Sequence, residues 1–139
     1  MGDKKTIWVV EDSTSAMALL LLKLKATGHN IVPIPTTDKA VERLQNSSER
    51  PDLLISDQFT DDENHKPSKI TGVELIEIAK KAGIAANILT SGDDLVSEAK
   101  KAGADFFQKA GTDWPEKLKT RVIELLGQVQ TSHQVSATR

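Results

Sequence analysis

The chain has 139 residues, 38% of them hydrophobic, which suits one packed domain of ordinary size. Its formal net charge of −2 leaves no basic excess to neutralise phosphates, which disfavours nucleic acid as a partner. It contains no cysteine, which excludes disulfides, thiolate catalysis and cysteine-ligated zinc and fits a cytoplasmic location. The longest apolar stretch, residues 16–22, is too short to span a bilayer, so we expect no membrane partner.

Five short apolar runs, rich in β-branched residues, alternate with five segments of helical periodicity. In chain order the runs cover residues 6–10, 31–34, 53–56, 87–89 and 105–107. Strands that alternate with helices form a parallel sheet covered on both faces. The pattern therefore predicts an α/β fold, a flavodoxin-like (βα)5 three-layer sandwich around a five-stranded sheet.

The second run contains Pro33, which cannot donate a backbone hydrogen bond to a neighbouring strand. Such a residue is tolerated at the edge of a sheet. This predicts that the second strand lies outermost, as it does in the flavodoxin-like strand order 2-1-3-4-5.

The helices are predicted from spacing and from their ends. Apolar residues recur at helical spacing in two stripes, Met17, Leu20, Leu21 and Leu24 in the first and Leu118, Val122, Leu125 and Val129 in the last. Thr71 with Glu74 has the form of a capping box, and Asp113 begins another helix. Leu19 and Leu22 lie off the first stripe, which indicates either a docking patch or simple helix propensity.

We predict one domain over residues 1–130. Residues 131–139 are polar and lack periodicity, which predicts a disordered C-terminal tail. The segment 60–71 is an unusually long polar connection whose role the sequence leaves open.

Acidic and hydroxyl side chains collect where the predicted strands end. The first strand is followed by Glu11 and Asp12, the third by Asp57, and the fourth by Thr90 and Ser91; Lys109 follows the fifth. Ligands of open parallel sheets bind outside these carboxyl ends, near the reversal of strand order. Three carboxylates about 5 Å apart repel strongly, by about 3 kcal/mol per pair at an effective dielectric constant near 20, and therefore need a cation. Mg²⁺, a hard ion that prefers oxygen ligands, suits such a cluster.

Four segments of the chain resemble the signature blocks of response-regulator receiver domains from two-component systems. They are residues 9–13 (VVEDS), 52–57 (DLLISD), 88–92 (ILTSG) and 102–109 (AGADFFQK), and the resemblance spans about residues 4 to 129. It implies a single-domain, chemotaxis-receiver-like phosphoprotein rather than an enzyme, which accepts a phosphoryl group in a Mg²⁺-dependent reaction. Its partners would be a sensor histidine kinase or a histidine phosphotransfer protein, together with an unidentified downstream protein.

The resemblance also implies residue roles. Asp57 would be the phosphoacceptor, forming a 4-aspartylphosphate. Asp12, Asp57 and the carbonyl of Phe59 would ligate Mg²⁺, with Glu11 acting mainly through metal-bound water. Lys109 would pair with the acceptor and then with a phosphoryl oxygen. Positive side chains generally assist phosphoryl transfer by neutralising the charge on the phosphoryl oxygens.

The resemblance leaves less defined which residues would switch the chain between the two signalling states of a receiver. Thr90 is the preferred switch hydroxyl, with Ser91 as an alternative, and Phe106 stands where receivers keep an aromatic switch residue. Ala110 follows Lys109 where many receivers have proline, so the isomer of that peptide bond stays open.

Two other function classes compete with a phosphorylated receiver. A degenerate receiver would bind partners without phosphorylation, but Glu11, Asp12, Asp57, Thr90 and Lys109 are all present. A Mg²⁺-dependent flavodoxin-like phosphohydrolase would carry a second Asp two residues after the nucleophile, where this chain has Phe59.

Overall fold

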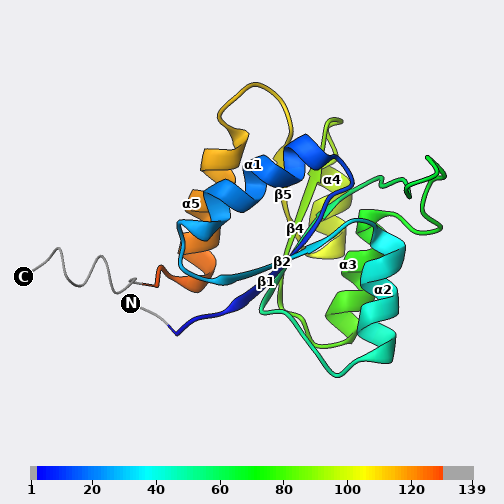
Figure 1. Ribbon diagram of the computed structural model, residues 1–139, viewed down its shortest axis with the longest axis horizontal. Coiled ribbons are helices and arrows are strands. Elements are labelled where there is room, and N and C mark those ends of the chain that lie inside the picture. The colour runs from blue at the N-terminus through cyan, green and yellow to red at the C-terminus, as the bar shows by residue number, and fades with distance from the viewer. Residues whose placement is uncertain (1–2, 130–139) are drawn as a thin grey trace, which may run out of the picture.

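The computed structural model describes residues 3–129, which form a parallel five-stranded sheet between two layers of helices (Figure 1). The strands are β1 (Thr6–Val10), β2 (Asn30–Ile34), β3 (Leu53–Asp57), β4 (Ala86–Ser91) and β5 (Asp105–Gln108). The helices are α1 (Thr14–Lys25), α2 (Thr37–Asn46), α3 (Gly72–Lys81), α4 (Val96–Ala102) and α5 (Trp114–Leu126). The predicted tail, residues 131–139, lies outside the described residues.

The strand order is β2-β1-β3-β4-β5, and every neighbouring pair is parallel. The predicted flavodoxin-like order is therefore confirmed. Pro33 lies in the edge strand β2, as predicted, where its missing N–H leaves no central hydrogen bond unmade. Strands β2, β3, β4 and β5 each extend one to three residues beyond their predicted runs, and most of the added residues are polar ones that continue the backbone pairing at the strand ends.

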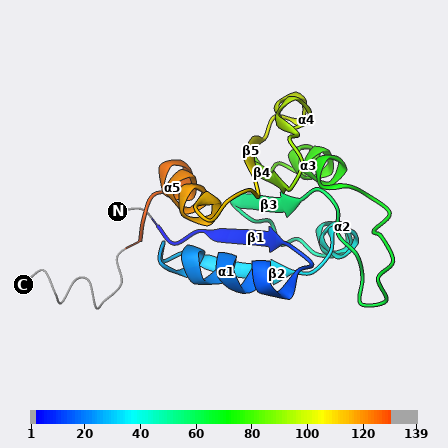
Figure 2. The ribbon, with the colours of Figure 1, turned by 90° about the horizontal axis from the view of Figure 1, so that it is seen from above.

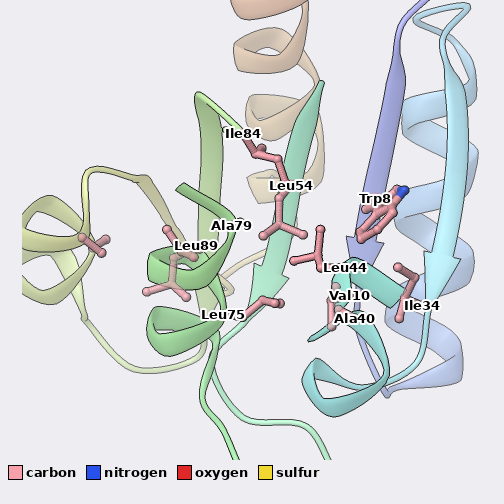
Figure 3. Packing of buried hydrophobic residues seen from close by; sticks show 13 residues of the cluster. Trp8, Val10, Ile34, Ala40, Leu44, Leu54, Leu75, Ala79, Ile84 and Leu89 are labelled. Atoms are coloured by element: carbon pink, nitrogen blue, oxygen red, sulfur yellow. The ribbon is translucent and has the colours of Figure 1, made fainter. Parts of the chain in front are cut away.

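Side chains alternate between the two faces of the sheet and build two separate cores. Trp8 and Val10 point toward α2, α3 and α4, where they join the cluster in Figure 3. Ile7 and Val9 point the other way, toward the layer of α1 and α5. Because both faces are covered, β1 and β3 are buried along nearly their whole length.

The helix ends agree with most of the predicted signals. The Thr71 hydroxyl accepts from the Glu74 amide and the Glu74 carboxylate accepts from the Thr71 amide, which confirms the capping box. Asp113 precedes α5 but makes no capping bond with its side chain, which pairs with Lys117 instead. Leu22 is 70% exposed, as its place off the buried stripe predicts.

Residues 60–71, which we call the arm, make up most of the segment between β3 and α3 and extend beyond the carboxyl end of β3 (Figures 1 and 2). A bridge between Asp61 and Pro67 brings its two sides together. Within residues 3–129, no helix has the length and apolar character needed to cross a membrane.

Candidate functional site

Three carboxylates meet at the carboxyl edge of the two central strands. Glu11 and Asp12 follow β1, and Asp57 ends β3, which lies next to β1 in the sheet. One oxygen from each carboxylate lies within 4.8 Å of the other two. Glu11 and Asp57 are buried, whereas Asp12 is exposed and leaves the cluster open on one side.

The Lys109 ammonium lies between the two buried carboxylates. Its Nζ is 2.9 Å from Asp57 Oδ2 and 3.0 Å from Glu11 Oε1. Burial alone lowers the pKa of Lys109, but the hydrogen bonds and charges of Asp57 and Glu11 outweigh that effect and raise it. The side chain therefore remains charged and is held at the acid cluster.

The Asp57 carboxyl has a raised pKa. Burial, and then the charge of Glu11, raise its pKa from 3.8 to about 6, although Lys109 and the Gln58 amide oppose the shift. Its Oδ1 accepts from the Gln58 amide at 2.9 Å. Burial, and then the neighbouring carboxylate, therefore disfavour the ionised form of Asp57, and a bound cation would favour it.

The backbone around Asp57 is held by α3. The Gly72 amide donates to the Gln58 carbonyl, and the Val73 amide donates to Gln58 Oε1 at 2.9 Å. A side chain on Gly72 would collide with the Asp57 carbonyl, so only glycine lets the helix begin this close to the strand. The sequence patterns did not indicate the role of Gln58.

Asp12 has a partner that the sequence did not reveal. Its Oδ2 accepts from the backbone amide of Asp61, the second residue of the arm, at 2.7 Å. Backbone amides carry no side-chain signature, so spacing alone could not have found this contact.

The two candidate hydroxyls lie on opposite faces of β4. Thr90 is the direct neighbour of Asp57 across the β3–β4 pairing, which puts both side chains on one face. Its hydroxyl has a single long contact, 3.5 Å to the Ser56 carbonyl, which is at the outer limit of a hydrogen bond. Ser91, one residue on, faces the other way and accepts from the Asp93 amide at 3.2 Å.

The two remaining candidates are Phe59 and Phe106, which differ in exposure. Phe59 is 62% exposed, just beyond Asp57. Phe106 is half-buried, pairs with Leu89 across β4 and β5, and packs against the same cluster as Leu95. The peptide bond between Lys109 and Ala110 is trans.

The fold and the position of this acid cluster define the class: a flavodoxin-like protein with its polar site at the switch point between β1 and β3. No protein-family model matches the sequence, and no curated protein matches it either.

Solved structures define the fold more narrowly. The receiver domain of a Francisella response regulator superposes with a TM-score of 0.70 at 18% identity, over 88% of this chain and 96% of that one. The BeF3-activated DrrB receiver domain gives 0.71 at 22% identity, over 88% and 97%. The chemotaxis response regulator CheY4 of Vibrio cholerae gives 0.70 at 19% identity, over 89% and 100%. The chain therefore has the CheY-like fold of response-regulator receiver domains.

Proposed function

We propose that this chain is a phosphoacceptor receiver domain of a cytoplasmic two-component system. In this proposal Asp57 accepts a phosphoryl group from a phosphohistidine on a sensor kinase or phosphotransfer protein. The observation that carries the proposal is the cluster of Glu11, Asp12 and Asp57 within 4.8 Å, with Lys109 Nζ 2.9 Å from Asp57. A receiver needs this combination of a nucleophilic carboxylate, a cation site and a fixed positive charge.

The donor set suits a hard divalent cation. All candidate ligands are oxygens, and the raised pKa of Asp57 reflects burial and the nearby Glu11 carboxylate. Asp12, Asp57 and the Phe59 carbonyl would hold Mg²⁺, and Glu11 would act through bound water. When bound, Mg²⁺ would supply positive charge opposite the phosphoryl oxygens.

The residues of the chain divide the transfer between them. An Asp57 carboxylate oxygen attacks the phosphorus, and the P–N bond of the phosphohistidine breaks as the P–O bond of the aspartyl phosphate forms. Lys109, already at 2.9 Å from Asp57, is placed to pair with one phosphoryl oxygen. The Thr90 hydroxyl, which has only the long contact to Ser56, is free to turn toward another.

The signal would leave through a protein partner. The half-buried Phe106 joins β5 to the packing under α4, so a rotamer change there would alter the exposed surface around Val96. The exposed leucines of α1, Leu19 and Leu22, are the proposed docking patch for the phosphodonor. BeF3 is a phosphoryl mimic, and the activated DrrB structure makes it a suitable probe for this chain.

Incubation with acetyl phosphate and Mg²⁺, followed by intact mass, tests the proposal. We expect the mass of one phosphoryl group on the parent chain and none on Asp57→Asn, which is nearly isosteric. Asp12→Ala should label poorly and bind Mg²⁺ more weakly in calorimetry. No labelling of the parent would favour a phosphorylation-independent binding module, and labelling that maps to Ser56, Ser91 or His65 would refute the assignment of Asp57.

A further inference from the structure

The stem of the arm consists of Thr60 on its outgoing side and residues 68–70 on its returning side. A network of buried hydroxyl groups holds this stem. Thr60 Oγ1 accepts from the Thr37 amide at 3.0 Å and lies 3.2 Å from the Thr37 hydroxyl. It also lies 2.8 Å from the Ser68 hydroxyl on the returning side of the arm. Thr60 is 2% exposed and Thr37 is fully buried, so the network is part of the packed structure.

The first turn of α2 also holds the returning side. The Asp38 carboxylate accepts from the Lys69 amide at 2.9 and 3.0 Å and from the Ile70 amide at 3.3 Å. The Thr37 hydroxyl donates to the Ile70 carbonyl at 2.7 Å. Two adjacent residues of α2 therefore fix both sides of the stem.

The tip of the arm closes on itself. The Asp62 carboxylate accepts from the amides of Asn64 and Lys66, and the Asp62 amide donates to the Lys66 carbonyl. These bonds join residues of the tip to one another. The place of the arm relative to the acid cluster is therefore set by its stem and by the contact of Asp61 with Asp12.

Asp61 directly follows the anchored Thr60, and its amide donates to Asp12 Oδ2 at 2.7 Å. We infer that the arm is a positioning device, in which Thr37 and Asp38 of α2 hold the stem so that the Asp61 amide orients the Asp12 carboxylate for a cation. This inference rests on the proposed function, in which a cation binds at the acid cluster. It adds Thr60 and Asp38 as positioning residues outside that cluster.

The physical reason is the cost of ordering an exposed side chain. Asp12 is exposed, unlike Glu11 and Asp57, so packing does not fix its rotamer. A hydrogen bond from a fixed amide restricts the carboxylate before any cation arrives, which removes part of that entropy cost. Groups that orient metal ligands in this way change metal affinity by about 10-fold to 100-fold when they are removed.

Four variants of the full chain test the inference. Thr60→Val removes the hydroxyl at nearly constant volume, whereas Thr60→Ser retains it and should rescue the effect. Asp38→Ala removes the clamp on Lys69 and Ile70 but leaves the buried threonine network in place. Glu42→Ala is the matched control, because it removes the same charge from the exposed side of α2 one turn later.

Two measurements are needed, and the first requires no metal. Hydrogen exchange of the Asp61 amide, followed by NMR in metal-free protein, should be about tenfold faster in Thr60→Val and Asp38→Ala. Calorimetric Mg²⁺ affinity should fall about tenfold in the same two variants. Thr60→Ser and Glu42→Ala should match the parent in both measurements.

The outcomes separate this inference from the proposed function. Parent-like exchange and parent-like affinity in both Thr60→Val and Asp38→Ala would overturn the positioning role. An equal loss of affinity in Glu42→Ala would also overturn it, because charge rather than orientation would then be the cause. A parent chain that binds no Mg²⁺ would refute the proposed cation site, while the exchange rates would still decide whether the stem fixes the Asp61 amide.

Discussion

The two edges of the sheet use polar side chains in opposite ways. At the amino edge, buried His29 accepts from the Lys5 amide at 3.0 Å through Nδ1, so its Nε2 carries the proton and donates to the Gly127 carbonyl at 2.7 Å. At the carboxyl edge, Glu11 and Asp57 share the ammonium of Lys109, and Asp12 adds a third carboxylate to the cluster. The amino edge joins chain segments together, whereas the carboxyl edge concentrates unbalanced charge.

This contrast separates hydrogen bonds that stabilise the fold from clustered charges that destabilise it, within one sheet. The bonds of His29 join the end of α5 to the turn before β2, and the Val129 amide strengthens the join by donating to the Thr27 carbonyl at 2.9 Å. Such neutral bonds are satisfied without any ligand. Like charges held together in a partly buried site cost stability and persist where they serve binding or catalysis. Substitutions at the two edges should therefore respond differently to Mg²⁺.

The largest effect is expected from removing the shared cation. Lys109→Met leaves two buried carboxylates without a counter-charge, which should lower the free energy of unfolding by about 3 kcal/mol in the absence of metal. Urea denaturation with and without Mg²⁺ measures this, and Mg²⁺ should restore part of the loss. Lys23→Met, which breaks the exposed pair with Glu116, is the control and should change stability far less. Equal losses of unfolding free energy in the two variants would show that Lys109 offsets no special repulsion between the buried carboxylates.

Removing one of the acids should have the opposite sign. The folded pKa of Asp57 is about 6 against an ordinary 3.8, so above pH 6 the folded state carries the full cost of ionising this carboxyl. Below about pH 4 the group is protonated in both states and the cost disappears. Metal-free Asp57→Asn should therefore exceed the parent in unfolding free energy by about 2 kcal/mol at pH 7.

Urea denaturation of both proteins at pH 7 and pH 4 checks this sign. The advantage of Asp57→Asn should shrink at pH 4, and it should shrink at pH 7 when Mg²⁺ is added. A parent that is more stable than the variant at pH 7 without metal would contradict the raised pKa.

At the amino edge the expected effect is smaller and independent of metal. His29→Ala leaves the Lys5 amide and the Gly127 carbonyl without their side-chain partner and should cost about 1.5 kcal/mol. The loss should be the same with and without Mg²⁺, and acetyl phosphate should still label the variant. A Mg²⁺-dependent loss in His29→Ala would remove the distinction between the two edges.

Sequence patterns predicted the strand order and the members of the acid cluster because both follow from local signals. Pro33 marked the edge strand, and the strand ends marked Glu11, Asp12, Asp57 and Lys109. The contacts that hold the site were not predictable in the same way. The Asp61 amide reaches Asp12 across 49 positions, and the Asp38 carboxylate binds amides 31 and 32 positions away. Backbone donors are the same at every non-proline residue, so only the folded path of the arm identifies them.

The smallest expected effect on stability concerns the two hydroxyls at the carboxyl edge, those of Thr90 and Ser91. The hydroxyl of Thr90 has only the 3.5 Å contact to Ser56, so Thr90→Val should change the unfolding free energy by under about 1 kcal/mol. Ser91→Ala loses the 3.2 Å bond from the Asp93 amide and should cost a similar amount. Stability therefore cannot distinguish the two, but the response to beryllofluoride can. Thr90 lies directly beside Asp57 and should donate to the phosphoryl mimic.

The aromatic NMR signals of Phe106 should therefore shift with beryllofluoride and Mg²⁺ in the parent and in Ser91→Ala, and stay unchanged in Thr90→Val. Alternation places Ser91 on the same face of the sheet as Leu89 and Phe106, which gives the opposite result a clear meaning. A response lost in Ser91→Ala and kept in Thr90→Val would make Ser91 the switch hydroxyl. Signals that stay unchanged in a saturated parent sample would show that output leaves through a surface other than the one under α4.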